Sequence, residues 1–380
     1  MSVNFPPAVL EIIQYIKEGR LLQNQATLNR ILAEDEKNLG FLLNVGISCA
    51  QANKLPDALF LFNCLSSFNK KDARIFYNLG LVQALLGNHQ EAIKAYDCAL
   101  SIEPDDLETL INKGSSCNDL QSYELALDTL KRAVQLNPNI PEAWSNMGIA
   151  LNHLHLYSDS VNAYQNAIQI QPQYFEAWLN QCIPLVKLKQ YQEALASCNK
   201  ALSLNSSHPE AWSNKGVVLI ELKQYAEAIA HFDKALSLNP DYAEAWSNKG
   251  AVLNELRQYQ EAITHFDKTL QLRPDHAQAW SNKGVSLNEL KRYEEAIIHY
   301  EKASSLKSDI SWLDGDLLHA KMKIADWRDF DKSLNTLLSK AGSEQKIAAP
   351  FAVLGLNDAP MFHKQCAEIF TREKHPLNLS

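Results

Sequence analysis

An asparagine recurs with a period of 34 through most of the chain and is the most uniform polar feature of the sequence. The eight positions are Asn44, Asn78, Asn112, Asn146, Asn180, Asn214, Asn248 and Asn282. Asn is a mediocre helix former, so helix propensity does not account for eight equivalent copies. A carboxamide offers both a donor and an acceptor, which match the N–H and C=O of a peptide unit. The pattern favours a ladder of peptide-binding amides; the alternative is a structural Asn that bonds an adjacent helix or water.

Lysine follows the ladder Asn in four repeats, at Lys113, Lys215, Lys249 and Lys283. A row of cations would bias a groove toward acidic ligands. Each Lys also lies three residues after a Trp or a Leu, so its stem can cover that side chain and, over Trp, form a cation–π pair. We favour the second interpretation and expect local pairs such as Trp246–Lys249.

Side chains that often bind metals are present, but their spacing does not predict a metal site. His231, His265 and His299 repeat with the same period as the Asn. Ligand atoms must lie about 2 Å from one ion, and equivalent positions in stacked repeats are too far apart to share it. We therefore expect these His on the outer face of the second helices. The seven Cys are odd in number and lack C-x-x-C spacing, which indicates buried free thiols in a reducing compartment.

Neither the motifs nor the composition indicates an enzyme, and we predict no catalytic residue and no cofactor. The sequence contains no H-E-x-x-H, G-x-S-x-G, Walker loop or G-x-G-x-x-G. The 380 residues carry a formal charge of −8, which argues against a nucleic-acid or membrane-surface binder. The start of the chain lacks the features of a secretory signal, and no apolar run is long enough for a membrane helix. We expect a soluble, cytoplasmic protein.

The elements that must position these residues repeat with the same period. The hexapeptide AWSNKG begins at Ala211, Ala245 and Ala279. A Gly lies four residues after the Trp position in most copies. A small residue lies sixteen residues after the Trp position and is followed by an aromatic residue. The spacing of Trp212, Gly216 and Leu219 defines one face of a helix, and the Gly allows a paired helix to approach closely. One helix pair cannot bury this stripe alone, so the pairs must stack.

The pattern W-x2-(L)-G … A-x3-F … P at period 34 resembles the tetratricopeptide repeat, and eight units match over residues 39–310. The resemblance implies an all-α solenoid, a right-handed superhelix of antiparallel helix pairs. It also implies that the Asn face is concave and that its amides bond the backbone of an extended peptide. We therefore predict a non-catalytic scaffold that binds a protein or peptide. The oligomeric state is not predicted.

The flanking segments are expected to extend the array. Residues 1–38 resemble a degenerate first unit, and residues 311–340 a pair of capping helices. The cap has one stripe at Leu313, Leu317, Ala320 and Ile324, and a second at Trp327, Phe330, Leu334 and Leu337. Residues 341–380 are expected to form a linker and a short terminal helix, capped by Asp358 and with Phe362 on one face.

The tail carries a second resemblance. Residues 317–330 and 349–360 are similar to the junction segment of bacterial O-linked N-acetylglucosamine transferase-like proteins. In that family a tetratricopeptide array leads into a two-lobed glycosyltransferase. The lobes are absent from this sequence, so no catalytic residue can be assigned. The resemblance implies an alternative function: the chain is the substrate-targeting half of such an enzyme.

Overall fold

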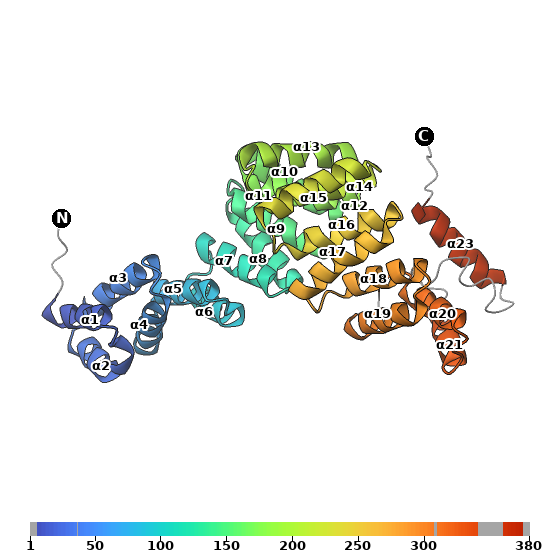
Figure 1. The fold of residues 1–380 in the computed structure, drawn as a ribbon. Helices are drawn as coiled ribbons and strands as arrows, with labels where there is room; N and C mark the ends of the chain where they lie inside the picture. Colours follow the sequence, from blue (N-terminus) through green and yellow to red (C-terminus); the bar gives the residue numbers. More distant parts are fainter. Residues whose placement is uncertain (1–5, 36, 308–309, 341–359, 375–380) are drawn as a thin grey trace. The chain divides into compact units, whose positions relative to one another are not determined.

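A computed structural model describes residues 6–35, 37–307, 310–340 and 360–374 of the protein. These residues form helices and the turns that join them, with no β-strand among them, which confirms the predicted all-α repeat of helix pairs (Figure 1). The chain divides into two compact units, Met1–Glu193 and Ala194–Ser380.

The helices alternate along the chain as first and second members of each pair, with α3 beginning the first pair and α19 ending the last. The first unit contains α1 (Pro7–Lys17), the 3-10 helix η1 (Leu21–Gln23), α2 (Gln25–Glu34), α3 (Lys37–Gln51), α4 (Leu55–Phe68), α5 (Ala73–Leu85), α6 (His89–Ile102), α7 (Leu107–Asp119), α8 (Tyr123–Leu136), α9 (Pro141–His153), α10 (Tyr157–Ile170), α11 (Phe175–Asn180) and α12 (Cys182–Lys187). Helix α13 (Tyr191–Leu204) begins in the first unit and continues into the second. The second unit continues with α14 (Pro209–Glu221), α15 (Tyr225–Leu238), α16 (Ala243–Glu255), α17 (Tyr259–Leu272), α18 (Ala277–Glu289), α19 (Tyr293–Leu306), α20 (Leu313–Lys323), α21 (Phe330–Lys340) and α23 (Pro360–Lys374).

The repeated Gly allows each aromatic ring to pack directly on the backbone of its paired helix. A Cβ added to Gly80 would lie 2.5 Å from the ring of Tyr96, and one added to Gly250 would lie 2.8 Å from that of Phe266. Both rings are fully buried. Any larger residue at the Gly position would therefore force the two helices of a pair apart.

The repeated Trp fastens the loop that precedes its own helix. The indole Nε1–H of Trp246 donates to the carbonyl oxygen of Pro240 at 2.8 Å. The same bond, to the carbonyl six residues earlier, is made by Trp144, Trp178, Trp212 and Trp280. The Trp therefore holds the connection between successive repeats, because its ring combines a large apolar surface with one directed donor.

The fifth repeat departs from the expected single first helix. Two short helices, α11 and α12, take its place and meet at Gln181. Pro184 has no N–H to donate to the carbonyl of Asn180, and its ring crowds that carbonyl, so the helix is interrupted there.

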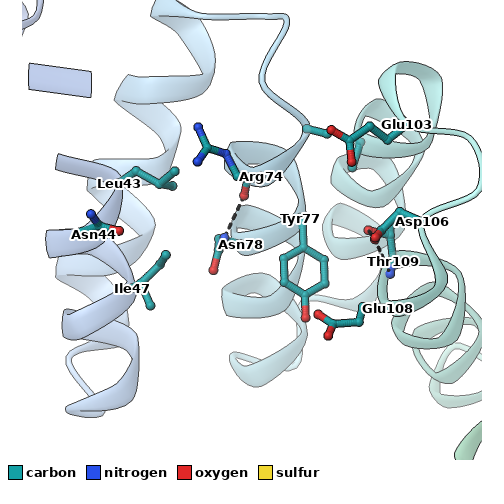
Figure 2. A pocket seen from close by; sticks show the side chains of 12 residues that line it. Leu43, Asn44, Ile47, Arg74, Tyr77, Asn78, Glu103, Asp106, Glu108 and Thr109 are labelled. Carbon is teal, nitrogen blue, oxygen red and sulfur yellow. Dashed lines mark hydrogen bonds between the residues drawn. The ribbon is translucent and has the colours of Figure 1, made fainter. Parts of the chain in front are cut away.

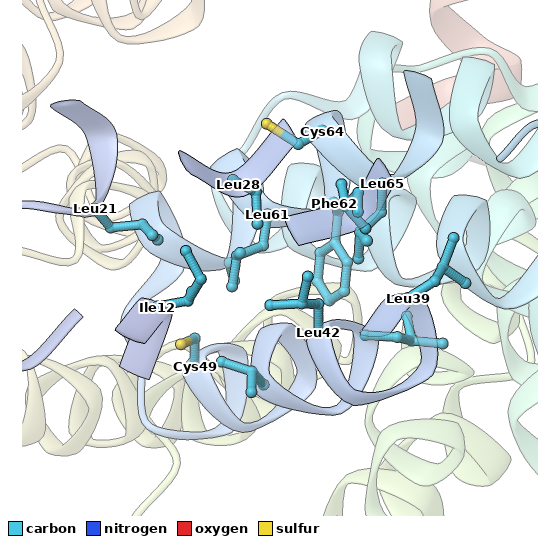
Figure 3. Close-up of a cluster of buried hydrophobic side chains, with 14 of the residues drawn as sticks. Ile12, Leu21, Leu28, Leu39, Leu42, Cys49, Leu61, Phe62, Cys64 and Leu65 are labelled. Carbon is cyan, nitrogen blue, oxygen red and sulfur yellow. The ribbon is translucent and has the colours of Figure 1, made fainter. Parts of the chain in front are cut away.

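The N-terminal residues add a core to the first repeat. Val9, Ile12 and Leu28 are completely buried and belong to one cluster with Leu61 and Phe62 of α4 (Figure 3). Apolar residues from α1 and α2 thus cover the surface that the first pair would otherwise expose.

Both predicted C-terminal stripes are partly buried: Leu317 and Ile324 of the first stripe are half-buried, and the second stripe is more exposed. Leu313 and Ala320 of α20 are buried in a cluster with residues of α18 and α19. Leu337 of α21 is buried, but Trp327 is 53% exposed. Helix α21 begins at Phe330, so Trp327 lies in the preceding turn and does not share the helical period. The predicted cap Asp358 and the side chain of Phe362 lie outside the described residues.

Candidate functional site

The eight ladder Asn all lie on first helices, five in the first unit and three in the second. Asn44 is exposed, Asn214 is 8% exposed, and the other six side chains are half-buried. Within each unit the amides recur once per helix pair, because one period of the sequence forms one pair. The surface of each unit therefore presents carboxamides at the same position of successive first helices.

Most ladder amides are not used by the fold. The Nδ2 of Asn78 donates to the carbonyl of Arg74 at 2.8 Å, and the Oδ1 of Asn282 accepts from Gln278 at 2.9 Å, both within one helix. The Nδ2 of Asn112 donates at 3.3 Å to the hydroxyl of Tyr77, a residue of the preceding first helix. Within the described part of the chain, the remaining side chains form no hydrogen bond: Asn44, Asn146, Asn180, Asn214 and Asn248.

A second set of Asn, six residues after the ladder, connects neighbouring first helices. The Nδ2 of Asn118 donates to the carbonyl of Asn146 at 2.9 Å, and that of Asn254 to the carbonyl of Asn282 at 3.2 Å. The Oδ1 of Asn254 also accepts from Ser286 at 2.7 Å. These bonds perform the structural task that was the alternative explanation for the ladder.

The predicted Lys–Trp cation–π pairs are wrong. The Nζ atoms of Lys113, Lys249 and Lys283 lie 2.6–2.7 Å from carboxylates on the second helix of the preceding repeat, at Asp97, Asp233 and Asp267. For Lys215, the residue at the position equivalent to these acids is Asn199. A carboxylate sixteen residues earlier is thus within reach and attracts the ammonium more strongly than the ring does. Three of the four cations are consequently paired with an acid of the protein itself.

The three repeated His lie against the Trp rings and not on the outer face of the second helices, which corrects that expectation. His231 stacks on Trp212 with 5.4 Å between ring centroids, His265 on Trp246 at 5.2 Å, and His299 contacts Trp280 at 5.3 Å. Burial is the main cause of the lowered pKa of all three imidazoles, and the positive charge of the nearby Lys lowers the pKa further. Among the described residues, no group of three or more His, Cys, Asp or Glu side chains is arranged to hold a metal ion.

A pocket of about 300 Å³ opens beside two of the ladder Asn in the first unit (Figure 2). Asn44 and the apolar Leu43 and Ile47 line it from α3, whereas Asn78, Tyr77 and Arg74 line it from α5. Glu103, which follows α6, and Asp106, Glu108 and Thr109 at the start of α7 complete the lining. The pocket combines an apolar wall with three carboxylates.

The polar side chains of this pocket have different roles. Asp106 caps α7 by accepting from the backbone N–H of Thr109 at 2.9 Å. Arg74 forms two hydrogen bonds with Asp72, at 3.0 and 2.7 Å, which lower the pKa of that carboxyl. Burial raises the pKa of Tyr77 to about 12, with a further contribution from Glu108. Arg74 is therefore already paired, while Glu103 and Glu108 are exposed.

Sequence reasoning missed Tyr77 and Glu103 because neither repeats with the period of the array, and it missed Glu108 although Glu recurs at that position at Glu142, Glu176, Glu210 and Glu244. It also missed Asp316, which lies on α20 one period after Asn282 and could have been found by continuing the ladder. Burial raises the pKa of Asp316 to about 7, and the charge of Glu289 adds to the increase. In the cap, the position equivalent to the ladder Asn is therefore occupied by an acid.

Family models for the tetratricopeptide repeat match stretches that together cover just over half of the chain. They span residues 73–106, 114–152, 185–208, 209–242 and 241–309. The comparison with curated proteins returned no match. None of the described helices combines the length and apolar character needed to cross a membrane.

Among solved structures, a chain of the APC/C hetero-tetramer Cut9–Hcn1 matches 82% of this chain with a TM-score of 0.58 and 16% identity. This chain spans 62% of that chain's length, and the likeness shows the fold alone. YrrB, described as a TPR protein with an unusual peptide-binding site, has a TM-score of 0.37 and 24% identity, over 51% of this chain and 97% of its own. MamA from Desulfovibrio magneticus RS-1 has a TM-score of 0.39 and 25% identity, over 45% of this chain and 96% of its own.

Proposed function

The chain belongs to the tetratricopeptide-repeat family, and from this premise we propose that it is a non-catalytic scaffold that binds an extended segment of a partner protein. The ladder Asn on the first-helix face, which we take to be concave, are the binding residues. One observation carries the proposal: the ladder amides are present in all eight repeats, yet five of them form no side-chain bond within the described residues.

The geometry of helix stacking suits this role. Neighbouring packed helices lie roughly 8–10 Å apart, and an extended chain rises about 3.3 Å per residue. One amide would therefore meet roughly every third residue of an extended ligand. Backbone recognition of this kind tolerates many side chains, because every peptide unit offers the same N–H and C=O.

The alternative, in which the ladder Asn serve to bond adjacent helices, is weakened because the two sets of Asn form different bonds. Helix-to-helix bonds are made by Asn118 and Asn254, whereas within the described residues Asn112 alone among the ladder Asn bonds a neighbouring first helix. Amides that lack a side-chain bond within the described residues, all of them but Asn214 at least partly exposed, are instead available to bond a ligand.

The experiment tests ligand binding and stability on the same variant. Individual peptides enriched from a degenerate library by the full chain are titrated against the Asn214→Ala, Asn248→Ala, Asn282→Ala triple variant. Each lost hydrogen bond is worth about 0.5–1.5 kcal/mol, so peptides held by the second unit should lose about 1.5–4.5 kcal/mol of binding free energy. The melting temperature should stay unchanged or rise, because Ala is the better helix former.

Asn254→Ala is the matched control, since it removes the same type of side chain from α16, the first helix that also carries Asn248. This variant should lower the melting temperature and leave affinity unchanged in the folded protein, because it removes one hydrogen bond each from the carbonyl of Asn282 and the hydroxyl of Ser286, which then bond only one another among side-chain partners. If the triple variant instead melts early and no peptide loses affinity, the ladder is structural and the proposal fails.

The second candidate is the substrate-targeting half of an O-linked N-acetylglucosamine transferase-like enzyme. Its support is the resemblance of residues 317–330, together with the exposed Trp327 in the turn before α21, which offers an aromatic contact for a further domain. Most of the other similar segment lies outside the described residues. The test is whether the same or an adjacent reading frame encodes glycosyltransferase lobes that copurify with this chain. Their absence would remove this candidate and leave the scaffold untouched.

A further inference from the structure

We propose that the pocket beside Tyr77 receives a Lys or Arg side chain of the bound segment, so that the first unit selects basic peptides. This inference rests on the proposed binding of an extended peptide by the ladder. It adds a side-chain specificity that the ladder itself lacks, because amides that bond a backbone do not distinguish one residue type from another.

The position of the pocket relates it to the ladder. Asn44 and Asn78 belong to its lining, and Asn112 bonds the hydroxyl of Tyr77, which also lines it. Figure 2 shows Asn44 on α3 and Asn78 on α5, with Tyr77 between Asn78 and the carboxylate of Glu108. A backbone held by Asn44 and Asn78 would pass over the opening. One of its side chains would then point into the pocket, because alternate side chains of an extended chain face opposite sides.

The size of the pocket fits one long side chain and not a large ligand. Its volume of about 300 Å³ lies at the lower end of the range for small-molecule sites. The walls supplied by Leu43, Ile47 and the ring of Tyr77 suit an aliphatic stem. A Lys or Arg side chain has such a stem and a charged end that reaches past it toward polar groups.

The charge of the pocket determines whether a cationic or an anionic side chain can occupy it. Three carboxylates line it, against one cation, Arg74, whose guanidinium is already bonded to Asp72. Asp106 is committed to capping α7, so Glu103 and Glu108 are the acids that can receive an incoming cation. Glu108 is held near the Tyr77 hydroxyl, which favours a fixed position for its carboxylate. An acidic side chain would be repelled at the same place.

The test uses the full chain and peptide libraries in which one central position is fixed as Arg, Lys, Gln or Glu and the flanking positions are degenerate. Peptides with Arg or Lys should be enriched about three- to thirtyfold over those with Gln, as two exposed ion pairs allow. The comparison of Arg with Lys shows which cation the pocket prefers. The Glu103→Gln, Glu108→Gln variant should abolish the preference, and the Glu103→Lys, Glu108→Lys variant should turn it toward Glu.

The matched control is Glu124→Gln, Asp128→Asn on α8, which removes the same charge from exposed positions that do not line the pocket. This variant should keep the preference for basic peptides. If peptides bind in a ladder-dependent manner without any preference for Arg or Lys, the pocket inference is wrong and the scaffold stands. If no library binds at all, the scaffold proposal itself fails, and the pocket inference fails with it.

Discussion

The first-helix faces of the two units differ in how strictly they repeat. In the second unit, the residue before the ladder Asn is Ser213, Ser247 or Ser281, and the residue after it is always Lys. In the first unit, the residue before Asn78 is Tyr77, and a pocket with carboxylates lies beside it. Near-identical copies produce a uniform surface suited to a feature that itself repeats, such as a peptide backbone. Divergent copies produce a local site that can select one side chain.

The packing beneath both faces is the same, which sharpens the contrast. Tyr96 in the first unit and Phe266 in the second both lie on a bare Gly backbone. The repeats of the two units therefore differ beside the ladder Asn, whereas the contact of a ring with a Gly of the paired helix recurs in both. Three sets of substitutions test this comparison.

The largest effect is expected from filling the helix contact. Gly80→Ala and Gly250→Ala should each destabilise the protein by about 1–3 kcal/mol from overpacking, offset in part by the better helix propensity of Ala. The new Cβ would meet the ring of Tyr96 or Phe266 at less than 3 Å. Chemical denaturation measures the change. Gly40→Ala on α3 is the control and should stabilise, because no atom lies within 4 Å of its added Cβ.

A smaller effect is expected at the turn inside each pair. The second residue after the first helix has a left-handed backbone, with φ of 78° at Gly87 in the first unit and 60° at Arg257 in the second. Gly adopts this conformation without steric cost, so Arg257→Gly should stabilise by about 0.5–1 kcal/mol and Gly87→Arg should destabilise by a similar amount. Opposite signs in the two thermal melts would support the comparison, whereas two losses of stability would show that the Arg side chain contributes contacts of its own.

The smallest effect concerns pH and the Trp–His stacks of the second unit. Burial lowers the folded-state pKa of His231, His265 and His299, so the unfolded chain binds more protons once the pH falls below the ordinary value of about 6.5. Stability should therefore decrease with falling pH in that range. Replacing all three with Gln should make the melting temperature less sensitive to pH between about 7 and 5.

The range above about pH 7.5 is the internal control, since all three imidazoles are neutral there in both states. Wild type and variant should show the same pH dependence in that range. An unchanged slope at acidic pH would mean that the stacks do not govern the titration.

The helix pairs and their stacking could be predicted because they depend on contacts that recur at fixed sequence distances. Gly250 and Phe266 are sixteen residues apart in every comparable pair, so their periodicity is visible in one chain. The interruption between α11 and α12 was missed, although Pro184 marks it, because the repeat pattern around it is otherwise intact. The ladder residues were correctly placed on first helices for the same reason as the Gly.

The sequence by itself determined that the chain stacks helix pairs with one Asn at the same place in each, because nearest-neighbour contacts impose a period. Only the tertiary structure decided which partner each polar group bonds. Lys249 bonds Asp233 instead of the Trp ring, and Asn254, not Asn248, joins neighbouring helices. Each choice depends on which partner lies within hydrogen-bond distance once the helices have packed, and several partners have the same sequence spacing. The Tyr77 pocket was likewise not predicted, because two of its lining residues, Tyr77 and Glu103, have no counterpart one period away in the sequence.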